Sequence, residues 1–233
     1  LLRWQHPSLG FIPPNRFIPV AERTGLINEM GAWVLRRACE DVQSWRAQGL
    51  GDLTVAVNVS PIQFHRDSIE REVTNALVAC QLPPHALELE LTESLLVADA
   101  QHLSEMLQRL RAQGVQIAID DFGTGYSNLG YLQRFAVHRL KIDQSFVRKM
   151  GTSAHDEGIV RAIIEMAHCL GLEVVAEGVE DAAMLQMLQS FGCEFGQGFH
   201  WSPALPTGEF MAFVRNHHDS PAELVTKPGN LIA

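Results

Sequence analysis

Two adjacent carboxylates end one of the most regular apolar segments of the sequence. Residues 115–128 read V-Q-I-A-I-D-D-F-G-T-G-Y-S-N, in which aliphatic side chains alternate with smaller or polar ones as far as Asp120 and Asp121. This alternation predicts a β-strand, and Gly123 and Gly125 predict a loop after it. Two like charges side by side are unfavourable unless a cation lies between them. A pair of turn residues, one of them capping the next helix, is the alternative for this stretch taken alone.

Other predicted strands also end in a polar side chain, on the face opposite to their aliphatic residues. The set comprises Asn58, Glu90, Asp120, Asp121, Lys141, Glu177 and Gln197. Single members have simpler explanations: Asn58 could satisfy a loop, Glu90 could be a buried acid with one partner, and Lys141 could reach the surface. Burying four carboxylates together without cations, however, is strongly unfavourable. We therefore expect the whole set to surround bound cations.

The ligand types indicate which metal and which chemistry. Oxygen ligands without histidine or cysteine favour Mg²⁺ or Mn²⁺ over zinc. Two adjacent carboxylates with ligands on either side indicate two ions about 4 Å apart, an arrangement suited to in-line attack of water on phosphorus. In this arrangement Lys141 would stabilise the developing charge or orient the nucleophile.

Six predicted strands have to position these side chains. They cover residues 53–60, 87–92, 138–143, 172–177 and 194–199, together with the strand that ends at Asp120 and Asp121. Helices are predicted between them, at residues 25–48, 61–80, 94–113, 127–134, 155–170 and 181–190. The proline-rich segment 12–19 is expected to be a loop at the rim of the fold, rather than a motif that binds a partner.

Strands and helices therefore alternate about every thirty residues, which is typical of βα units and a parallel sheet. An open doubly wound sheet and a closed (β/α)8 barrel both fit this alternation. The barrel is favoured because strand after strand places its polar residue at the C-terminal end, where the catalytic residues of such barrels lie.

Composition limits the classes of protein and partner. The chain has 233 residues, 46% of them hydrophobic, which fits one large α/β domain. We expect this domain to cover residues 1–215 and the polar residues 216–233 to form a loose tail. The net charge of −9 argues against binding to DNA. Four scattered cysteines and the absence of a membrane-length apolar run predict a soluble, cytoplasmic domain. The chain starts in mid-pattern without methionine, so we expect upstream sensor or regulatory domains, and membrane attachment of the full-length protein is compatible with this.

Several motifs, in order along the chain, resemble those of the EAL-domain phosphodiesterases. They are L-L-R-W-Q-H-P (1–7), F-I-P-V-A-E-R-T-G-L-I (17–27), N-V-S (58–60), E-L-T-E (90–93), D-D-F-G-T-G-Y-S (120–127), L-K-I-D (140–143), A-E-G-V-E (176–180) and Q-G-F (197–199). The resemblance covers residues 1 to about 213. It implies a modified TIM barrel, two Mg²⁺ or Mn²⁺ ions, and hydrolysis of cyclic diguanylate (c-di-GMP) to linear pGpG, which lowers the level of this bacterial second messenger. It also suggests a homodimer.

The resemblance assigns a role to each residue that matches a family motif. The implied metal ligands are Asn58, Glu90, Asp120, Asp121 and Glu177. The implied catalytic residues are Lys141, near the attacking water, Glu177, and Gln197, which reaches the water or the metal shell. Arg3 would contact a phosphate of the substrate and Asp143 would lie near a guanine or the wall of the site. Glu93 would hold the loop 121–127.

The chain departs from the family pattern at its start. The glutamate of the motif that names the family is expected two residues before Leu1, and the first barrel strand is missing or truncated. Asn128 and Gln144 replace residues common in the family, with no disabling effect. A non-catalytic receptor for c-di-GMP and a protein-interaction module with a vestigial site are the alternatives. Catalysis is favoured because receptors in this family usually lose metal ligands, the lysine or the loop glutamate, and every one of these that falls inside the chain is present.

Three other motif matches are set aside. The sequence D-F-G at 121–123 lacks the companion motifs of a kinase, and G-x-G at 123–125 lacks the third glycine of a dinucleotide-binding loop. The pairs His155-Asp156 and His218-Asp219 lack further histidines at helical spacing, so a histidine-rich metal site is not predicted.

Overall fold

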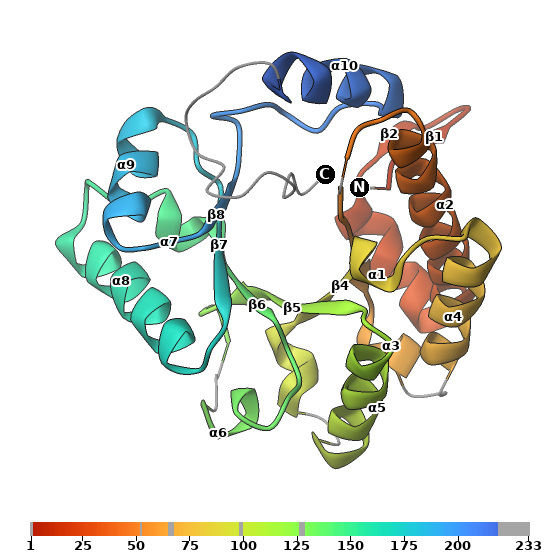
Figure 1. Cartoon of the computed structure of the whole chain (residues 1–233), viewed down its shortest axis with the longest axis horizontal. Coiled ribbons are helices and arrows are strands. Elements are labelled where there is room, and N and C mark those ends of the chain that lie inside the picture. Colours follow the sequence, from red (N-terminus) through yellow and green to blue (C-terminus); the bar gives the residue numbers. More distant parts are fainter. Residues whose placement is uncertain (1, 52, 65–67, 98–99, 126–128, 219–233) are drawn as a thin grey trace.

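A computed structural model describes residues 2–51, 53–64, 68–97, 100–125 and 129–218. Its centre is a six-stranded parallel sheet with the strands in sequence order from β3 to β8. The strands are β3 (Val55–Val59), β4 (Leu87–Thr92), β5 (Gln116–Phe122), β6 (Arg139–Ile142), β7 (Glu173–Glu177) and β8 (Phe195–Gln197). Figure 1 shows this sheet curled at the centre of the molecule, with helices around its outer side.

The helices follow the strands as a βα pattern requires. After the hairpin β1 (Trp4–His6) and β2 (Gly10–Ile12), the helices are α1 (Pro14–Thr24), α2 (Ile27–Ala47), α3 (Pro61–Phe64), α4 (Ser68–Cys80), α5 (Ala100–Ala112), α6 (Leu129–Leu132), α7 (Gln144–Val147), α8 (Ala154–Cys169), α9 (Ala182–Ser190) and α10 (Thr207–His218). Short 3₁₀ helices cover Pro84–Ala86 and Glu93–Val97. Among the described residues, no helix is both long and apolar enough to cross a membrane.

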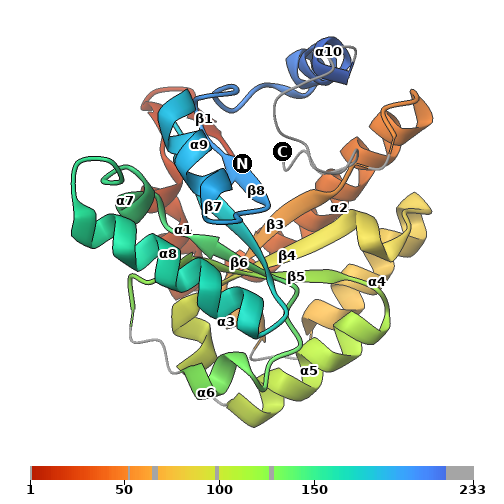
Figure 2. The same cartoon turned by 60° about the vertical axis from the view of Figure 1, so that its left-hand side comes forward.

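The sheet forms the wall of an incomplete barrel. Each strand from β4 to β7 pairs in parallel with both of its sequence neighbours, while β3 and β8 are the two edges. A wall of parallel strands in sequence order, covered outside by helices, is the barrel type rather than the doubly wound type. The six predicted strands are therefore confirmed, and the described residues form the curled parallel sheet of the predicted barrel (Figures 1 and 2).

The apolar faces of the strands explain why the helices pack outside. Val57, Leu89 and Ile117 stand in register on three neighbouring strands, and all three are buried. They belong to one continuous core that includes side chains from α2, α4, α5 and α8. The opposite faces of the strands, which carry the polar residues, are thereby left to point into the barrel.

The proline-rich segment was predicted wrongly. Residues 14–24 form α1 rather than a rim loop, and Pro19 lies inside this helix. A proline such as Pro19 is unfavourable inside a helix. Pro14, by contrast, stands at the first helical position, where proline is well tolerated. Burial of Phe17 and Ala21 then stabilises the helix. It ends at Gly25, whose φ of 78° lies in the left-handed region, so the predicted single helix 25–48 begins only at Ile27.

Other boundaries differ in smaller ways. The predicted helix 61–80 is two helices, α3 and α4, and the predicted helix 94–113 is a 3₁₀ helix followed by α5. The short helix α7 was not predicted. Helix α10 was also missed and includes residues 216–218, which were expected to begin the loose tail. The rest of that tail, residues 219–233, lies outside the described residues.

Candidate metal centre and active site

Parallel pairing brings the polar strand ends to one edge of the sheet. Asn58 on β3 stands beside Glu90 on β4, and Glu177 on β7 stands beside Gln197 on β8. Asp120 on β5 pairs with Thr92, two residues after Glu90. Because parallel strands all end on the same side, these side chains meet at the C-terminal mouth of the barrel, as predicted.

Lys141 is the centre of this arrangement. Its Nζ atom lies 2.6 Å from Glu90 Oε1, 3.0 Å from Asp120 Oδ1 and 2.6 Å from Glu177 Oε1. The lysine is 3% exposed and β6 holds it between β4, β5 and β7. On the far side of Glu90, the amide of Asn58 donates a hydrogen bond of 2.7 Å to Oε2. One lysine therefore connects carboxylates from three strands.

A backbone irregularity turns the second aspartate toward the same place. In a regular strand Asp120 and Asp121 would point to opposite faces. The pairing of β5 with β6 shifts register between Ile119 and Phe122, and Asp121 has a φ of 54°. A left-handed residue other than glycine costs roughly 1–3 kcal/mol and is commonest at functional sites. As a result, one carboxylate oxygen from each of Asp120, Asp121 and Glu177 lies within 4.8 Å of the others.

The carboxylate cluster, defined as Glu90, Asp120, Asp121 and Glu177, has more negative charge than its lysine neutralises. Burial raises the pKa of Glu90 to about 7, although Lys141 opposes this rise. Burial also raises the pKa of Glu177, and burial together with Asp120 raises that of Asp121. Burial alone would lower the pKa of Lys141, but the surrounding carboxylates outweigh it and raise the pKa. Four carboxylates and one lysine share this site, and additional cations would favour the charged form of each carboxylate.

The donor set fits divalent cations that prefer oxygen. It consists of carboxylates and the Asn58 amide, without histidine or cysteine, as Mg²⁺ and Mn²⁺ require. Beside Glu177, the Oε1 atom of Gln197 is buried and has no hydrogen-bond partner among the described residues. An unpaired buried acceptor at this edge is a second sign that the site receives a cation or a water molecule.

Glu93 connects the strand β4 to the loop after β5. Its Oε2 atom accepts the backbone N–H of Gly123 at 3.0 Å and that of Gly125 at 3.3 Å. Glu93 is buried, and a Cβ atom at Gly125 would come within 2.8 Å of its carboxylate. The glycine therefore allows the loop backbone to approach this acid closely. Residues 126–128, the rest of the loop assigned to Glu93, lie outside the described residues.

The two residues predicted to contact the substrate have different surroundings in the structure. Asp143 follows β6, caps α7 by accepting the Ser145 N–H at 2.9 Å, and raises the pKa of neighbouring Asp121. It therefore borders the carboxylate cluster. Arg3 is exposed before β1 and donates to the Leu2 carbonyl at 3.2 Å. Among the described residues, no hydrogen bond or ion pair joins Arg3 to the cluster.

Sequence reasoning missed a contact made just after Asn58, the first predicted metal ligand in the chain. The Ser60 hydroxyl, two residues after Asn58, donates to Glu22 Oε1 at 2.7 Å. The Ser60 N–H donates to the buried Gln63, whose side chain lies against Gly31 on α2. Glu22 and Ser60 fall in the motifs 17–27 and 58–60, but nothing in their local pattern shows that they touch.

A surface hollow of about 590 Å³ lies elsewhere. It is lined by Gln108, Arg111 and Ala112 at the end of α5 and by residues 133–136 before β6. These segments lead into the N-terminal ends of β5 and β6, opposite to the mouth. None of the predicted site residues lines it.

Comparison with known proteins agrees with this architecture. The sequence profile of the EAL domain matches residues 1–204. MucR of Pseudomonas aeruginosa, named a bifunctional diguanylate cyclase/cyclic di-GMP phosphodiesterase, is 44% identical over 214 residues, which are 92% of this chain and 31% of MucR. NbdA of the same organism, named a cyclic di-GMP phosphodiesterase, is 44% identical over 215 residues, which are 92% of this chain and 28% of NbdA.

The solved structures show the same fold. A structure described as the PaMucR phosphodiesterase in complex with c-di-GMP has a TM-score of 0.86 and 43% identity, covering 90% of this chain and 85% of that one. The EAL enzyme Bd1971, bound to cAMP and cyclic-di-GMP, has a TM-score of 0.88 and 32% identity, covering 92% of this chain and 59% of that one. The chain spans about a third or less of the two curated relatives named above. On its sequence and on its fold, the chain belongs to the EAL domain family.

Proposed function

We propose that this chain is a metal-dependent phosphodiesterase domain that hydrolyses c-di-GMP to linear pGpG. The observation that carries the proposal is the carboxylate cluster around Lys141 at the barrel mouth. The family supports the choice of substrate, because relatives at 44% identity are named c-di-GMP phosphodiesterases and a related structure is described as a c-di-GMP complex. In the reaction one P–O bond of the ring breaks and the oxygen of water bonds to that phosphorus.

The metal ligands would be Asn58, Glu90, Asp120, Asp121 and Glu177. Two Mg²⁺ or Mn²⁺ ions held there would supply the positive charge that makes water a nucleophile and stabilises the attacked phosphate. Lys141, buried among these ligands, would orient the nucleophile or stabilise the developing charge with its ammonium group. The Oε1 atom of Gln197, which has no partner in the part of the chain that the structure describes, would accept a hydrogen bond from the attacking water. Glu93 would hold the loop backbone beside the ligands.

Substrate contacts are proposed from the family motifs. Arg3 would bind a phosphate through its guanidinium group, which suits phosphate geometry. Asp143, which borders the cluster, would lie near a guanine or the wall of the site.

The test is hydrolysis of c-di-GMP with Mg²⁺ or Mn²⁺, followed by separation of linear pGpG. It uses the chain together with whatever residues precede Leu1 in its natural protein. The parent is expected to form pGpG and to stop when EDTA removes the metal. Glu90→Gln removes a charged ligand, and Lys141→Ala removes an electrostatic contribution of the kind that accounts for roughly 10²–10³ in rate. Both variants are expected to lose turnover, while Lys141→Ala is expected still to bind c-di-GMP.

Exposed Lys149, a few residues further along, provides the matched control. Lys149→Ala is expected to keep the parent rate. Tight binding of c-di-GMP by the parent without any linear product would overturn the proposal and identify a receptor instead.

The wider setting of the domain is proposed on the same basis. The curated relatives are about three times longer than this chain, which supports additional sensor or regulatory domains in the full-length protein. A homodimer, a cytoplasmic location and a domain limit near residue 215 remain predictions from the sequence and its resemblance.

A further inference from the structure

A second polar layer lies inside the barrel, beneath the carboxylate cluster. Side chains two or four residues apart on a strand share a face. Glu88 therefore points to the same side as Glu90, Arg139 to the same side as Lys141, and Glu173 to the same side as Glu177. These three residues stand nearer the N-terminal ends of β4, β6 and β7, with Glu88 and Arg139 roughly 7 Å along the strand from their partners above.

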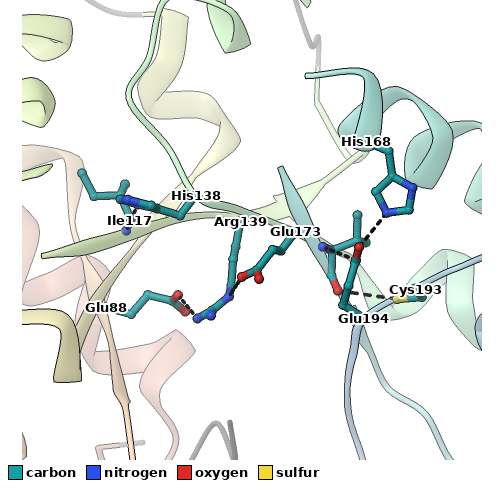
Figure 3. Close-up of polar contacts among 9 residues, drawn as sticks. Glu88, Ile117, His138, Arg139, His168, Glu173, Cys193 and Glu194 are labelled. Atoms are coloured by element: carbon teal, nitrogen blue, oxygen red, sulfur yellow. Dashed lines mark hydrogen bonds and ion pairs between the residues drawn. The ribbon is translucent and has the colours of Figure 1, made fainter. Parts of the chain in front are cut away.

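The guanidinium group of Arg139 joins this layer together. Its Nη1 atom lies 2.6 Å from Glu88 Oε2, and its Nε atom lies 2.9 Å from Glu173 Oε2. The same group lies 4.9 Å from the centre of the Phe195 ring on β8. Figure 3 shows Arg139 between the two carboxylates, with Glu88 on one side and Glu173 on the other.

The ion pairs of Arg139 connect β4 to strands with which β4 shares no backbone hydrogen bonds. The strand order is β4-β5-β6-β7, so backbone hydrogen bonds link β4 only to β3 and β5. Between Glu90 on β4 and Arg139 on β6, the residue of β5 in register with both is Ala118. Its small side chain leaves room for the arginine to reach Glu88. Arg139 thus joins β4 to β7, the strands that carry Glu90 and Glu177.

Stability alone does not account for this arrangement. Buried ion pairs are often no more stabilising than apolar residues of similar volume. Glu88 is completely buried, and its Oε1 atom has no hydrogen-bond partner among the described residues. A buried acid that is only partly satisfied is kept at a cost in stability. A role in constraining the strand ends that carry the carboxylate cluster would explain why Glu88 is kept.

We propose that Arg139 is a positioning residue for the metal centre. By holding Glu88 and Glu173 across the barrel floor, it sets the separation at which Glu90 and Glu177 can share ions. This inference rests on the proposed function, since it assumes that these carboxylates bind Mg²⁺ or Mn²⁺.

The test measures Mn²⁺ binding to metal-free protein by calorimetry or by the EPR signal of free Mn²⁺. The main variant, Glu88→Leu with Arg139→Met, removes one positive and one negative charge and leaves no unpaired buried group, while the partly exposed Glu173 can be solvated. It is expected to keep the parent melting temperature within a few degrees but to bind Mn²⁺ about 10- to 100-fold more weakly, as for other residues that support metal ligands. Arg139→Lys, which keeps the charge but cannot reproduce the fork of two bonds, is the second variant, and weaker binding is expected from it too.

The matched control is Glu70→Leu with Arg109→Met, which removes an ion pair of 2.9 Å on the outer surface. It is expected to leave Mn²⁺ affinity unchanged. Parent-like Mn²⁺ affinity in both Arg139 variants would overturn the inference. Failure of the parent itself to bind Mn²⁺ would instead overturn the proposed metal-dependent function, so the two failures are distinguishable.

Discussion

At the scale of single residues, the chemistry of the site follows from an imbalance of charge. Lys141 contacts three carboxylates at 2.6–3.0 Å, and Asp121 adds a fourth close by. One ammonium group cannot neutralise four acids, and burial raises the pKa of Glu90 to about 7, with Asp120 adding to the rise and Lys141 opposing it. Oxygen-preferring divalent cations would restore the balance and bring phosphate chemistry with them.

Glu93 allows a sharp test of a residue that holds the loop backbone after β5. Glu93→Gln keeps the size of the side chain but removes the charge that strengthens its bonds from Gly123 and Gly125. Because those bonds hold the loop beside Asp121, c-di-GMP turnover is expected to fall about 10- to 100-fold, the usual effect of losing a residue that supports a metal site. Steady-state assays with saturating Mg²⁺ measure this. Glu105→Gln, an exposed acid on α5, is the control, and a parent-like rate in Glu93→Gln would show that the loop needs no anchor.

At the scale of elements, β5 and β6 position the site through one irregular pairing. Their register shift lets β5 present two consecutive acids, which a regular strand cannot do. His138, just before β6, holds the beginning of the paired strands β5 and β6. Its N–H donates to the Ile117 carbonyl at 2.8 Å, and its Nδ1 atom accepts the Ile117 N–H at 3.1 Å (Figure 3).

The burial of His138 in the folded state makes stability depend on pH. Burial lowers the pKa of His138 from 6.5, and Arg111 and Arg139 lower it further against the opposing effect of Glu173. The folded state therefore prefers neutral histidine, so the stability it contributes is complete above pH 6.5 and is lost as the pH falls below that value. His138→Asn offers a non-titrating acceptor for the Ile117 N–H.

Urea unfolding at pH 8.0 and pH 6.0 measures the effect as a difference between the two proteins. The parent is expected to lose more stability than His138→Asn on acidification, by up to roughly 1 kcal/mol, the contribution of one hydrogen bond. Comparison with the variant removes the effect of every other titrating group. An equal loss in both proteins would mean that His138 does not report on this pH range.

At the scale of the whole molecule, the proposed metal ligands come from the ends of four strands, β3, β4, β5 and β7, so cation binding there would be coupled to folding. An ion that binds only the folded state at 100 times its dissociation constant raises the free energy of unfolding by about 2.7 kcal/mol. For a chain of this size each kcal/mol corresponds to roughly 2–4 °C in melting temperature.

Thermal unfolding with and without Mg²⁺ tests this coupling. The parent is expected to melt several degrees higher in saturating Mg²⁺, and EDTA is expected to reverse the shift. Asp120→Asn is expected to lose most of the shift because it removes the charge of a proposed ligand that lies 3.0 Å from Lys141 and within 4.8 Å of Asp121 and Glu177. Asp41→Asn on α2, away from the barrel interior, is expected to keep it. A parent melting temperature that does not respond to Mg²⁺ or Mn²⁺ would contradict a metal centre at this mouth.

The amino-acid sequence by itself determined where the six strands lie along the chain and which polar residue ends each of them. These features are local: alternation along a strand and glycine or proline at its limits require no knowledge of distant residues. The oxygen donors and the barrel class followed from them. The local pattern failed at residues 14–24, where propensity predicted a loop, because burial of Phe17 against the rest of the fold is not visible locally.

Only the tertiary structure decided how the polar residues meet. The register shift that brings Asp121 beside Asp120, the three ion pairs of Lys141 and the bridge from Arg139 to Glu88 and Glu173 all depend on how far the sheet curls and how neighbouring strands are staggered. Pairing across 30 to 50 residues of sequence is set by the packing of the complete core, which no single segment encodes. For that reason the candidate ligands and Glu93 could be named from the sequence, but the ion pairs that Arg139 makes beneath them could not.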